Sequence, residues 1–271
     1  MWEHFVDLLA TYSIIAFIAY IGATLAIITR LFHPQGPNQL LVLLLGCGAI
    51  VVHTLGVSQQ MFFNDKINFS LPYVISLVSL IITMTITAVA TRYKVNLLLP
   101  VIYGFAGIWQ LLLVFVPGVG AIPLAAEKAL LISHITLALI AYCVLVIATL
   151  YAFQVAYINF KLKSKNLAAV NQLPPLMQVE NQLFLILAIG TFCLFTSEVS
   201  GFVFLDNFFA KDKLHKTVLS LFALAIYLIT LFGHYKRGWR GHKVLILTIC
   251  ATSLLTLSYF GSRFVKEFLL S

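Results

Sequence analysis

Residues 129–153 read ALLISHITLALIAYCVLVIATLYAF, a run of 25 residues without one charged side chain. A transmembrane helix needs about 20 mostly apolar residues to cross the hydrocarbon core of a bilayer. The run meets that length and is far more apolar than the surface of a water-soluble protein. It therefore predicts a membrane-spanning helix.

Seven other stretches meet the same criterion, so the sequence predicts an all-α, polytopic bundle of eight transmembrane helices. The chain of 271 residues is 61% hydrophobic and 10% charged, whereas soluble domains are about half apolar and about a quarter charged. These values exclude a soluble globule, a disordered tail and a nucleic-acid-binding module, and we expect a single integral membrane domain over residues 1–271. The predicted spans are Leu8–Thr29, Leu40–Val57, Leu71–Ala90, Val95–Val116, Ala129–Phe153, Leu183–Phe204, Leu214–Phe232 and Val244–Gly261.

Charges on the connections predict the orientation of the chain. Ten basic residues and one acid, Glu180, fall on one side of the bundle, whereas seven basic and seven acidic residues fall on the other side. Cytoplasmic loops carry an excess of Lys and Arg, so both chain termini are expected to face outward. The ten basic residues are Arg30, Arg92, Lys94, Lys161, Lys163, Lys165, Lys236, Arg237, Arg240 and Lys243.

The longest predicted connection is cytoplasmic and runs from about residue 159 to residue 182. It carries a basic triplet, Lys161, Lys163 and Lys165, which can lie against anionic lipid headgroups. Pro174 and Pro175 follow and prevent a continuous helix through the connection. We interpret it as an interfacial linker, with a partner-docking segment as the alternative.

The motifs of soluble enzymes are missing from the sequence. The four cysteines lie inside predicted spans and form no C-x-x-C pair, which argues against thiol–disulfide exchange and structural zinc. The sequence also has no phosphate-binding Walker loop, dinucleotide fingerprint, H-E-x-x-H or G-x-S-x-G. No catalytic residue is predicted, and we do not expect an enzyme.

Ionisable residues inside the predicted spans are more informative, because such residues are costly in a membrane and usually serve function. From their positions along the helices, His53, His134, His215 and Glu198 are predicted to share the outer half of the bilayer. His234 lies near the inner end of its span, roughly 20 Å below the level of His53.

A cluster of neutral imidazoles can bind haem iron, zinc or copper, and a nearby carboxylate such as Glu198 can orient a ligand histidine. Two alternatives remain at this point. The histidines and Glu198 could form a proton or cation pathway, or the histidines could be unconnected packing residues. For His234 the alternative is an interfacial histidine that hydrogen bonds to the basic turn Tyr235–Gly241.

Several segments resemble the cytochrome c assembly family, which includes CcsA, CcmC and HemX. The stretch from Leu231 to Lys243, LFGHYKRGWRGHK, is similar to the C-terminal signature of that family, and SHIT at residues 133–136 is similar to its histidine-led middle span. The resemblance covers nearly the whole chain. It is sharpened by TR at 91–92 with LLLP at 97–100, LPPLM at 173–177 and YFGSR at 259–263.

The resemblance implies a multi-pass protein of the bacterial inner membrane that binds haem and serves cytochrome c assembly. His134 would take the place of an external haem-ligand histidine, and His234 that of the membrane histidine before the Gly-Trp-Arg-Gly turn. His53 would occupy an earlier membrane histidine. In the haem-binding hypothesis, His53, His134 and His215 form the outer ligand set, with His234 as an inner station. The expected partners are the lipid bilayer and haem-handling or cytochrome c maturation proteins; the chain would hand haem on without making bonds itself.

One departure from the family pattern widens the choice of function. Haem-presenting members carry a W-G-x-x-W-x-W-D segment before the span that ends in the membrane histidine, but the corresponding residues Asn207–His215 contain no Trp. HemX-like members share this lack, so one alternative is a membrane regulator of tetrapyrrole synthesis that acts through its basic cytoplasmic loops. The other is a small proton- or metal-coupled transporter that uses Glu198 and the outer histidines.

Overall fold

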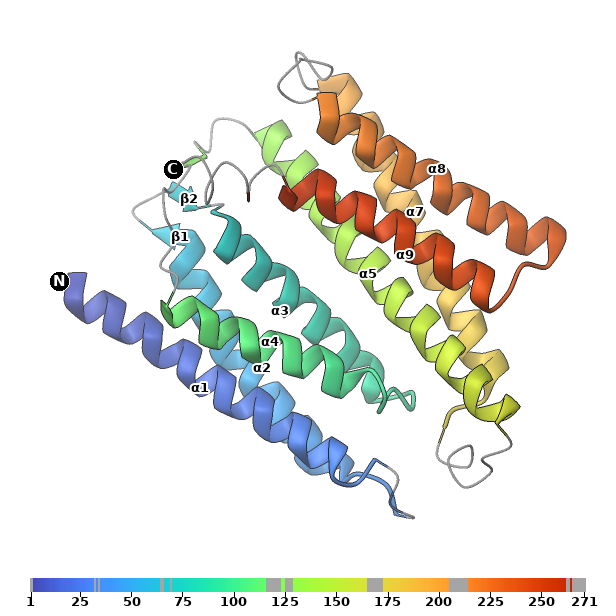
Figure 1. The fold of residues 1–271 in the computed structure, drawn as a ribbon. Helices are drawn as coiled ribbons and strands as arrows, with labels where there is room; N and C mark the ends of the chain where they lie inside the picture. The colour runs from blue at the N-terminus through green and yellow to red at the C-terminus, as the bar shows by residue number, and fades with distance from the viewer. Residues whose placement is uncertain are drawn as a thin grey trace. The chain divides into compact units, whose positions relative to one another are not determined.

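The computed structural model describes residues 2–31, 33, 35–63, 66–68, 70–115, 123–124, 129–164, 173–204, 214–261 and 264, and most of these lie in long helices (Figure 1). Packing divides the chain into two compact units, Met1–Ala126 and Glu127–Ser271, hereafter unit 1 and unit 2. Whether the two units together form the single membrane domain predicted over residues 1–271 depends on how they combine, so that statement stays a prediction.

Unit 1 is a helical bundle in which α1 packs against α2 and α4, while α3 packs against α2 and α4. A small antiparallel sheet of order β1-β2-β3 joins the α2–α3 connection to the segment that follows α4. The elements are α1 (Trp2–Ile28), α2 (Gln39–Met61), β1 (Phe62–Phe63), β2 (Lys66–Asn68), α3 (Leu71–Ala90), α4 (Leu99–Phe115) and β3 (Pro123–Leu124).

The interior of unit 1 contains many hydroxyl groups. Ser76, Ser79, Thr83 and Thr87 recur at intervals of three or four residues along α3, so they share one face of the helix, and all four are buried. Close packing brings aromatic side chains to this interior: a Cβ on Gly46 of α2 would overlap the Tyr103 side chain of α4. The bundle is therefore tightly packed around a polar centre.

Unit 2 is a second helical bundle, in which the long helices α5 and α7 pack against each other. Helix α9 packs against α5 and α8, and α8 also contacts α7. Gly190 of α7 allows a close approach to α5, because a Cβ there would lie 2.8 Å from the Leu145 side chain. The elements are α5 (Ala129–Lys163), α7 (Leu176–Phe204), α8 (Leu214–Arg237), α9 (His242–Thr256) and the π-helix η1 (Leu257–Gly261).

Each of the eight predicted spans coincides with a helix, which confirms the all-helical prediction; Val116, at the end of the fourth span, lies outside the described residues. Within the described part of the chain, seven helices are long and apolar enough to cross a membrane. The remaining one, α4, is apolar but has 17 residues. It begins at Leu99 rather than Val95, with Pro100 in its first turn, where a proline is tolerated.

The predicted connection over residues 159–182 was too long. Helix α5 continues to Lys163, and α7 already begins at Leu176, directly after Pro174 and Pro175. Amphipathic residues such as Tyr157 and Lys161 extend α5 beyond its apolar run, and the Lys161 ammonium lies 5.5 Å from the centre of the Tyr157 ring. Lys165 of the basic triplet lies outside the described residues.

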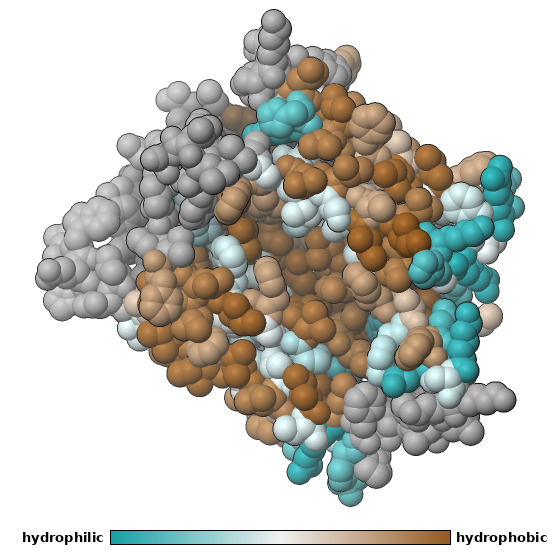
Figure 2. All heavy atoms as spheres, in the orientation of Figure 1, coloured by the Kyte–Doolittle hydropathy of each residue, from teal (hydrophilic) through white to brown (hydrophobic). Residues whose placement is uncertain are grey.

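Large apolar side chains cover the outside of both units, as Figure 2 shows for one face. Ile18, Leu44, Phe192 and Phe222 are each more than 60% exposed. A helix that is hydrophobic on all sides must be surrounded by protein or lipid. These exposed faces therefore suit contact with lipid chains, as expected for membrane-spanning helices.

Candidate functional site

His53 lies at the centre of unit 1 and is 1% exposed. Its Nδ1 is 3.1 Å from the Tyr20 hydroxyl of α1. Its Nε2 is 2.7 Å from the amide nitrogen of Gln110 on α4 and 3.0 Å from the Ser76 hydroxyl of α3. One imidazole therefore joins all four helices of the unit.

These contacts occupy both ring nitrogens of His53. On the Nδ1 side, the Tyr20 hydroxyl also lies 3.3 Å from the Thr83 hydroxyl, which donates to the Leu80 carbonyl. Neither ring nitrogen is left for a metal ion, so this arrangement does not fit an iron ligand.

His134, near the start of α5 in unit 2, is held differently. Its Nδ1 lies 3.0 Å from the Ser197 carbonyl oxygen and 3.0 Å from the Ser200 hydroxyl, both on α7. Because a carbonyl oxygen only accepts, Nδ1 carries the proton and Nε2 carries the lone pair. Nε2 has no hydrogen bond from the described residues, and the side chain is half-buried.

His234, at the end of α8 in unit 2, repeats this pattern. Its Nδ1–H donates to the Trp239 carbonyl over 3.0 Å, and its ring stacks on Phe184 of α7 with ring centres 3.3 Å apart. Within the described chain, its Nε2 also has no hydrogen-bond partner. The structure shows the hydrogen bond to the basic turn that the alternative from the sequence predicted.

The turn after α8 is built to present the Trp239 carbonyl. Gly238 has φ +65°, and its N–H donates to the His234 carbonyl, which closes the helix with a left-handed residue. The Trp239 N–H donates to the Gly233 carbonyl, and the indole packs where a Cβ on Gly233 would overlap it.

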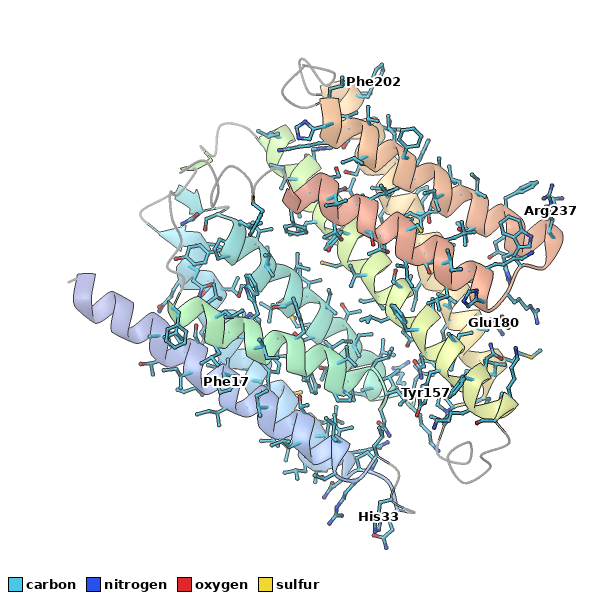
Figure 3. All side chains as sticks on the ribbon, viewed as in Figure 1. Phe17, His33, Tyr157, Glu180, Phe202 and Arg237 are labelled. Atoms are coloured by element: carbon cyan, nitrogen blue, oxygen red, sulfur yellow. The ribbon has the colours of Figure 1, made fainter. Side chains whose placement is uncertain are left out.

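An ion pair joins this turn to the start of α7. Arg240 Nη1 lies 3.7 Å from Glu180 Oε2, the single acid predicted on the cytoplasmic side. Figure 3 labels Glu180 and Arg237, which lie at this end of unit 2.

His215 and Glu198 lie in the same unit as His134. His215 is exposed in the first turn of α8. The Glu198 carboxyl group is within hydrogen-bonding reach of Ser220 on α8, whereas the groups that orient His134 are Ser197 and Ser200. Glu198 therefore contacts α8, whereas Ser197 and Ser200 on α7 hold His134; the role of Glu198 in orienting a ligand histidine stays a prediction.

His134 and His234 belong to separate sites along α7. His134 bonds to Ser197 and His234 stacks on Phe184, positions that are roughly 20 Å apart along the helix at about 1.5 Å per residue. They cannot bind the same iron. The predicted combination of His53 with His134 joins different units, whose relative placement is not determined.

Neither His134 nor His234 belongs to a larger group of metal-binding side chains among the described residues. Structural zinc takes four protein ligands and catalytic zinc three, but no group of three His, Cys, Asp or Glu side chains able to hold a metal occurs among the described residues. Haem iron needs only one or two axial ligands from the protein. Metal-binding histidines usually donate their other ring N–H to a carbonyl or carboxylate, as His134 and His234 do.

Several residues of these arrangements were not predicted from the sequence. Gln110 and Tyr20 lie far from His53 in the chain, and Phe184 lies far from His234. The sequence indicated Ser197 and Ser200 only weakly: their spacing of three residues places them on one face of a helix, next to Glu198 in the chain.

Comparison with known proteins identifies the family of this chain. The model of a family described as cytochrome C assembly protein matches residues 41–270. The chain is 36% identical over 258 residues to the inner membrane protein YpjD of Escherichia coli strain K12, covering 94% of this chain and 98% of the relative, with the same values for YpjD of strains O157:H7 and O6:H1. No solved structure matches. The chain is thus a multi-pass inner-membrane protein, and it belongs to the cytochrome c assembly family.

Proposed function

We propose that this protein binds haem at two separate stations in unit 2, one at His134 and one at His234, and serves cytochrome c assembly by holding and passing on the cofactor. The observation that carries the proposal is shared by both histidines. Each imidazole donates Nδ1–H to a backbone carbonyl, which leaves the Nε2 lone pair for iron.

The surroundings of each histidine support its role. Ser197 and Ser200 hold the ring of His134 from α7, while Phe184 and the Trp239 carbonyl hold the ring of His234. Because each imidazole ring is already held in place, it loses little further conformational entropy when a ligand binds. His215 is the candidate for a second ligand at the outer station, because it opens α8 in the same unit.

Haem is the proposed cargo; when bound, it would bring an iron centre and a flat apolar ring. The residues of this chain would hold it by axial coordination and would surround it with apolar helix faces. No residue is assigned to bond-making chemistry, and the proposed protein is not an enzyme. Partners in cytochrome c maturation or haem handling would deliver and receive the cofactor.

We also propose that the bundle crosses the membrane eight times with both termini outside. Helix α4 has 17 residues, the lower end of the range of about 17–25 that spans a bilayer. The end of α8 and the turn to α9 carry the basic residues Lys236, Arg237, Arg240 and Lys243, which suits the cytoplasmic side. His134 then belongs to the outer station and His234 to the inner one.

The direct test is to purify the full chain in detergent after expression with ample haem and to record its visible spectrum and pyridine haemochrome. The expected result is bound haem that decreases in His134→Ala. His33→Ala is the matched control, because His33 is exposed in unit 1 and its Nδ1 accepts the Gln35 N–H over 3.3 Å. Absence of haem, even after reconstitution, would contradict the proposal.

A further inference from the structure

Basic side chains from three helices gather at one end of unit 2, hereafter the basic end. Two contacts hold these segments together. A Cβ on Gly241, in the turn between α8 and α9, would lie 3.8 Å from the Asn159 amide nitrogen of α5. On the other side of the turn, Arg240 pairs with Glu180 of α7. The basic residues of this end are Lys161, Lys163, Lys236, Arg237, Arg240 and Lys243.

Positive charge at the basic end far exceeds negative charge. Among the residues that the structure describes there, Glu180 is the only acid, and Arg240 is its partner. Lys163 and Lys243 are exposed, and neither makes an ion pair with a described residue. A surface with such an excess of one sign attracts ligands of the opposite sign. The basic end therefore suits an anion.

Lys163 and Lys243 lie on either side of the contact between α5 and the turn. Lys163 is four residues after Asn159 and so shares the face of α5 that meets Gly241. Lys243 is two residues after Gly241, and its ammonium lies 5.9 Å from the centre of the Trp239 ring. The indole N–H, which can only donate, has no hydrogen bond from the described residues. Two ammonium groups and this N–H are thus available to a phosphate group.

Apolar side chains beside these lysines indicate the class of anion. Phe160 and Leu162 of α5 are 65% and 42% exposed, and Ile246 of α9 is 46% exposed. Each lies within one helical turn of Lys163 or Lys243. Figure 2 shows hydrophilic side chains gathered at the end of α8 and the start of α9, next to apolar surface. This border fits a molecule that has both a negative headgroup and apolar chains.

We propose that the basic end of unit 2 binds the headgroup of an anionic phospholipid, with Lys163 and Lys243 as its main contacts to the phosphate. The acyl chains would lie along the apolar faces of α5 and α9. Basic residues beside membrane-spanning helices recognise anionic lipids in this way. The proposal is separate from haem binding, because neither lysine is part of a haem station. Lipid retention is therefore measured on protein without haem.

The test is native mass spectrometry of the full chain in detergent, titrated with phosphatidylglycerol or with zwitterionic phosphatidylcholine. The wild type should retain more phosphatidylglycerol than phosphatidylcholine. Lys163→Gln combined with Lys243→Gln should lower the retention of phosphatidylglycerol several-fold and leave that of phosphatidylcholine unchanged. Arg92→Gln combined with Lys94→Gln is the matched control, which removes two exposed positive charges from unit 1 and should retain lipid like the wild type.

Two further measurements separate charge from side-chain identity and lipid from free phosphate. Lys163→Arg combined with Lys243→Arg keeps both charges and should retain phosphatidylglycerol like the wild type. Glycerol 3-phosphate, which has the phosphate but no acyl chains, should not displace the lipid at equal concentration. Wild-type retention in the glutamine variant, an equal loss in the unit 1 control, no recovery with arginine, or displacement by glycerol 3-phosphate would overturn the proposal.

Discussion

In unit 1 the imidazole of His53 has partners on both ring nitrogens, whereas in unit 2 His134 and His234 each have a described partner on Nδ1 alone. The difference lies at Nε2, which contacts the Gln110 amide in unit 1 and has no hydrogen bond from the described residues in unit 2. A histidine inside a membrane span is therefore a candidate ligand only when its second nitrogen is free.

The largest expected effect is the loss of haem from unit 2. Changing His134→Ala and His234→Ala together should remove all bound haem, because each residue supplies the axial ligand of its own station. Each single change should remove only part, since the two stations are roughly 20 Å apart along α7. Pyridine haemochrome measures the content, and complete loss in either single variant would mean that the histidines share one site.

A change at His53 should affect stability rather than haem. His53→Leu removes the hydrogen bonds that the Gln110 amide, the Ser76 hydroxyl and the Tyr20 hydroxyl make to the imidazole, so part of their bonding capacity is left unpaired; the Gln110–Ser76 and Tyr20–Thr83 contacts remain. Leaving a buried polar group unpaired costs about 1–3 kcal/mol in the free energy of unfolding. Unfolding by SDS titration in mixed micelles measures that free energy; an unchanged value would show that the His53 layer does not hold the bundle together.

Close packing of α2 against α4 gives a third test in unit 1. In Gly46→Ala the new methyl group would overlap Tyr103, so we expect a loss of about 1–3 kcal/mol in the free energy of unfolding. Gly48→Ala is the matched control, because a Cβ at Gly48 meets nothing within 4 Å. Equal stability of the two variants would contradict the packing at Gly46.

The smallest expected effect concerns the ion pair at the end of unit 2. Arg240 is 60% exposed and its guanidinium lies 3.7 Å from the Glu180 carboxylate. Such exposed pairs contribute about 0–1 kcal/mol, less at high salt. Arg240→Gln should therefore lower the thermal unfolding temperature slightly at low ionic strength and leave the spectrum of any bound haem unchanged. A large spectral change would assign Arg240 to the binding site.

The positions of the spans were predictable because they depend on composition alone. An apolar run of sufficient length, such as residues 129–153, must be buried in lipid or protein wherever its neighbours lie. The ends of helices were less predictable: α5 continues ten residues further to Lys163, because amphipathic side chains extend a helix through the membrane interface.

The environment of each histidine was not predictable in the same way. Which atoms meet Nε2 of His53 depends on the packing of α4 against its neighbours, and Gln110 lies 57 residues away in the chain. The bond of His234 to its turn was predictable as an alternative, since Trp239 is only five residues away. Local sequence thus indicated one partner of one histidine, and tertiary packing decides the others.

The most direct test of this account compares His53→Leu, His134→Ala and His234→Ala for bound haem per polypeptide, measured by pyridine haemochrome on folded protein. The account predicts that His53→Leu retains the wild-type content while each of the other two variants loses a part of it. Loss of haem in His53→Leu, with full content in His134→Ala and His234→Ala, would contradict it.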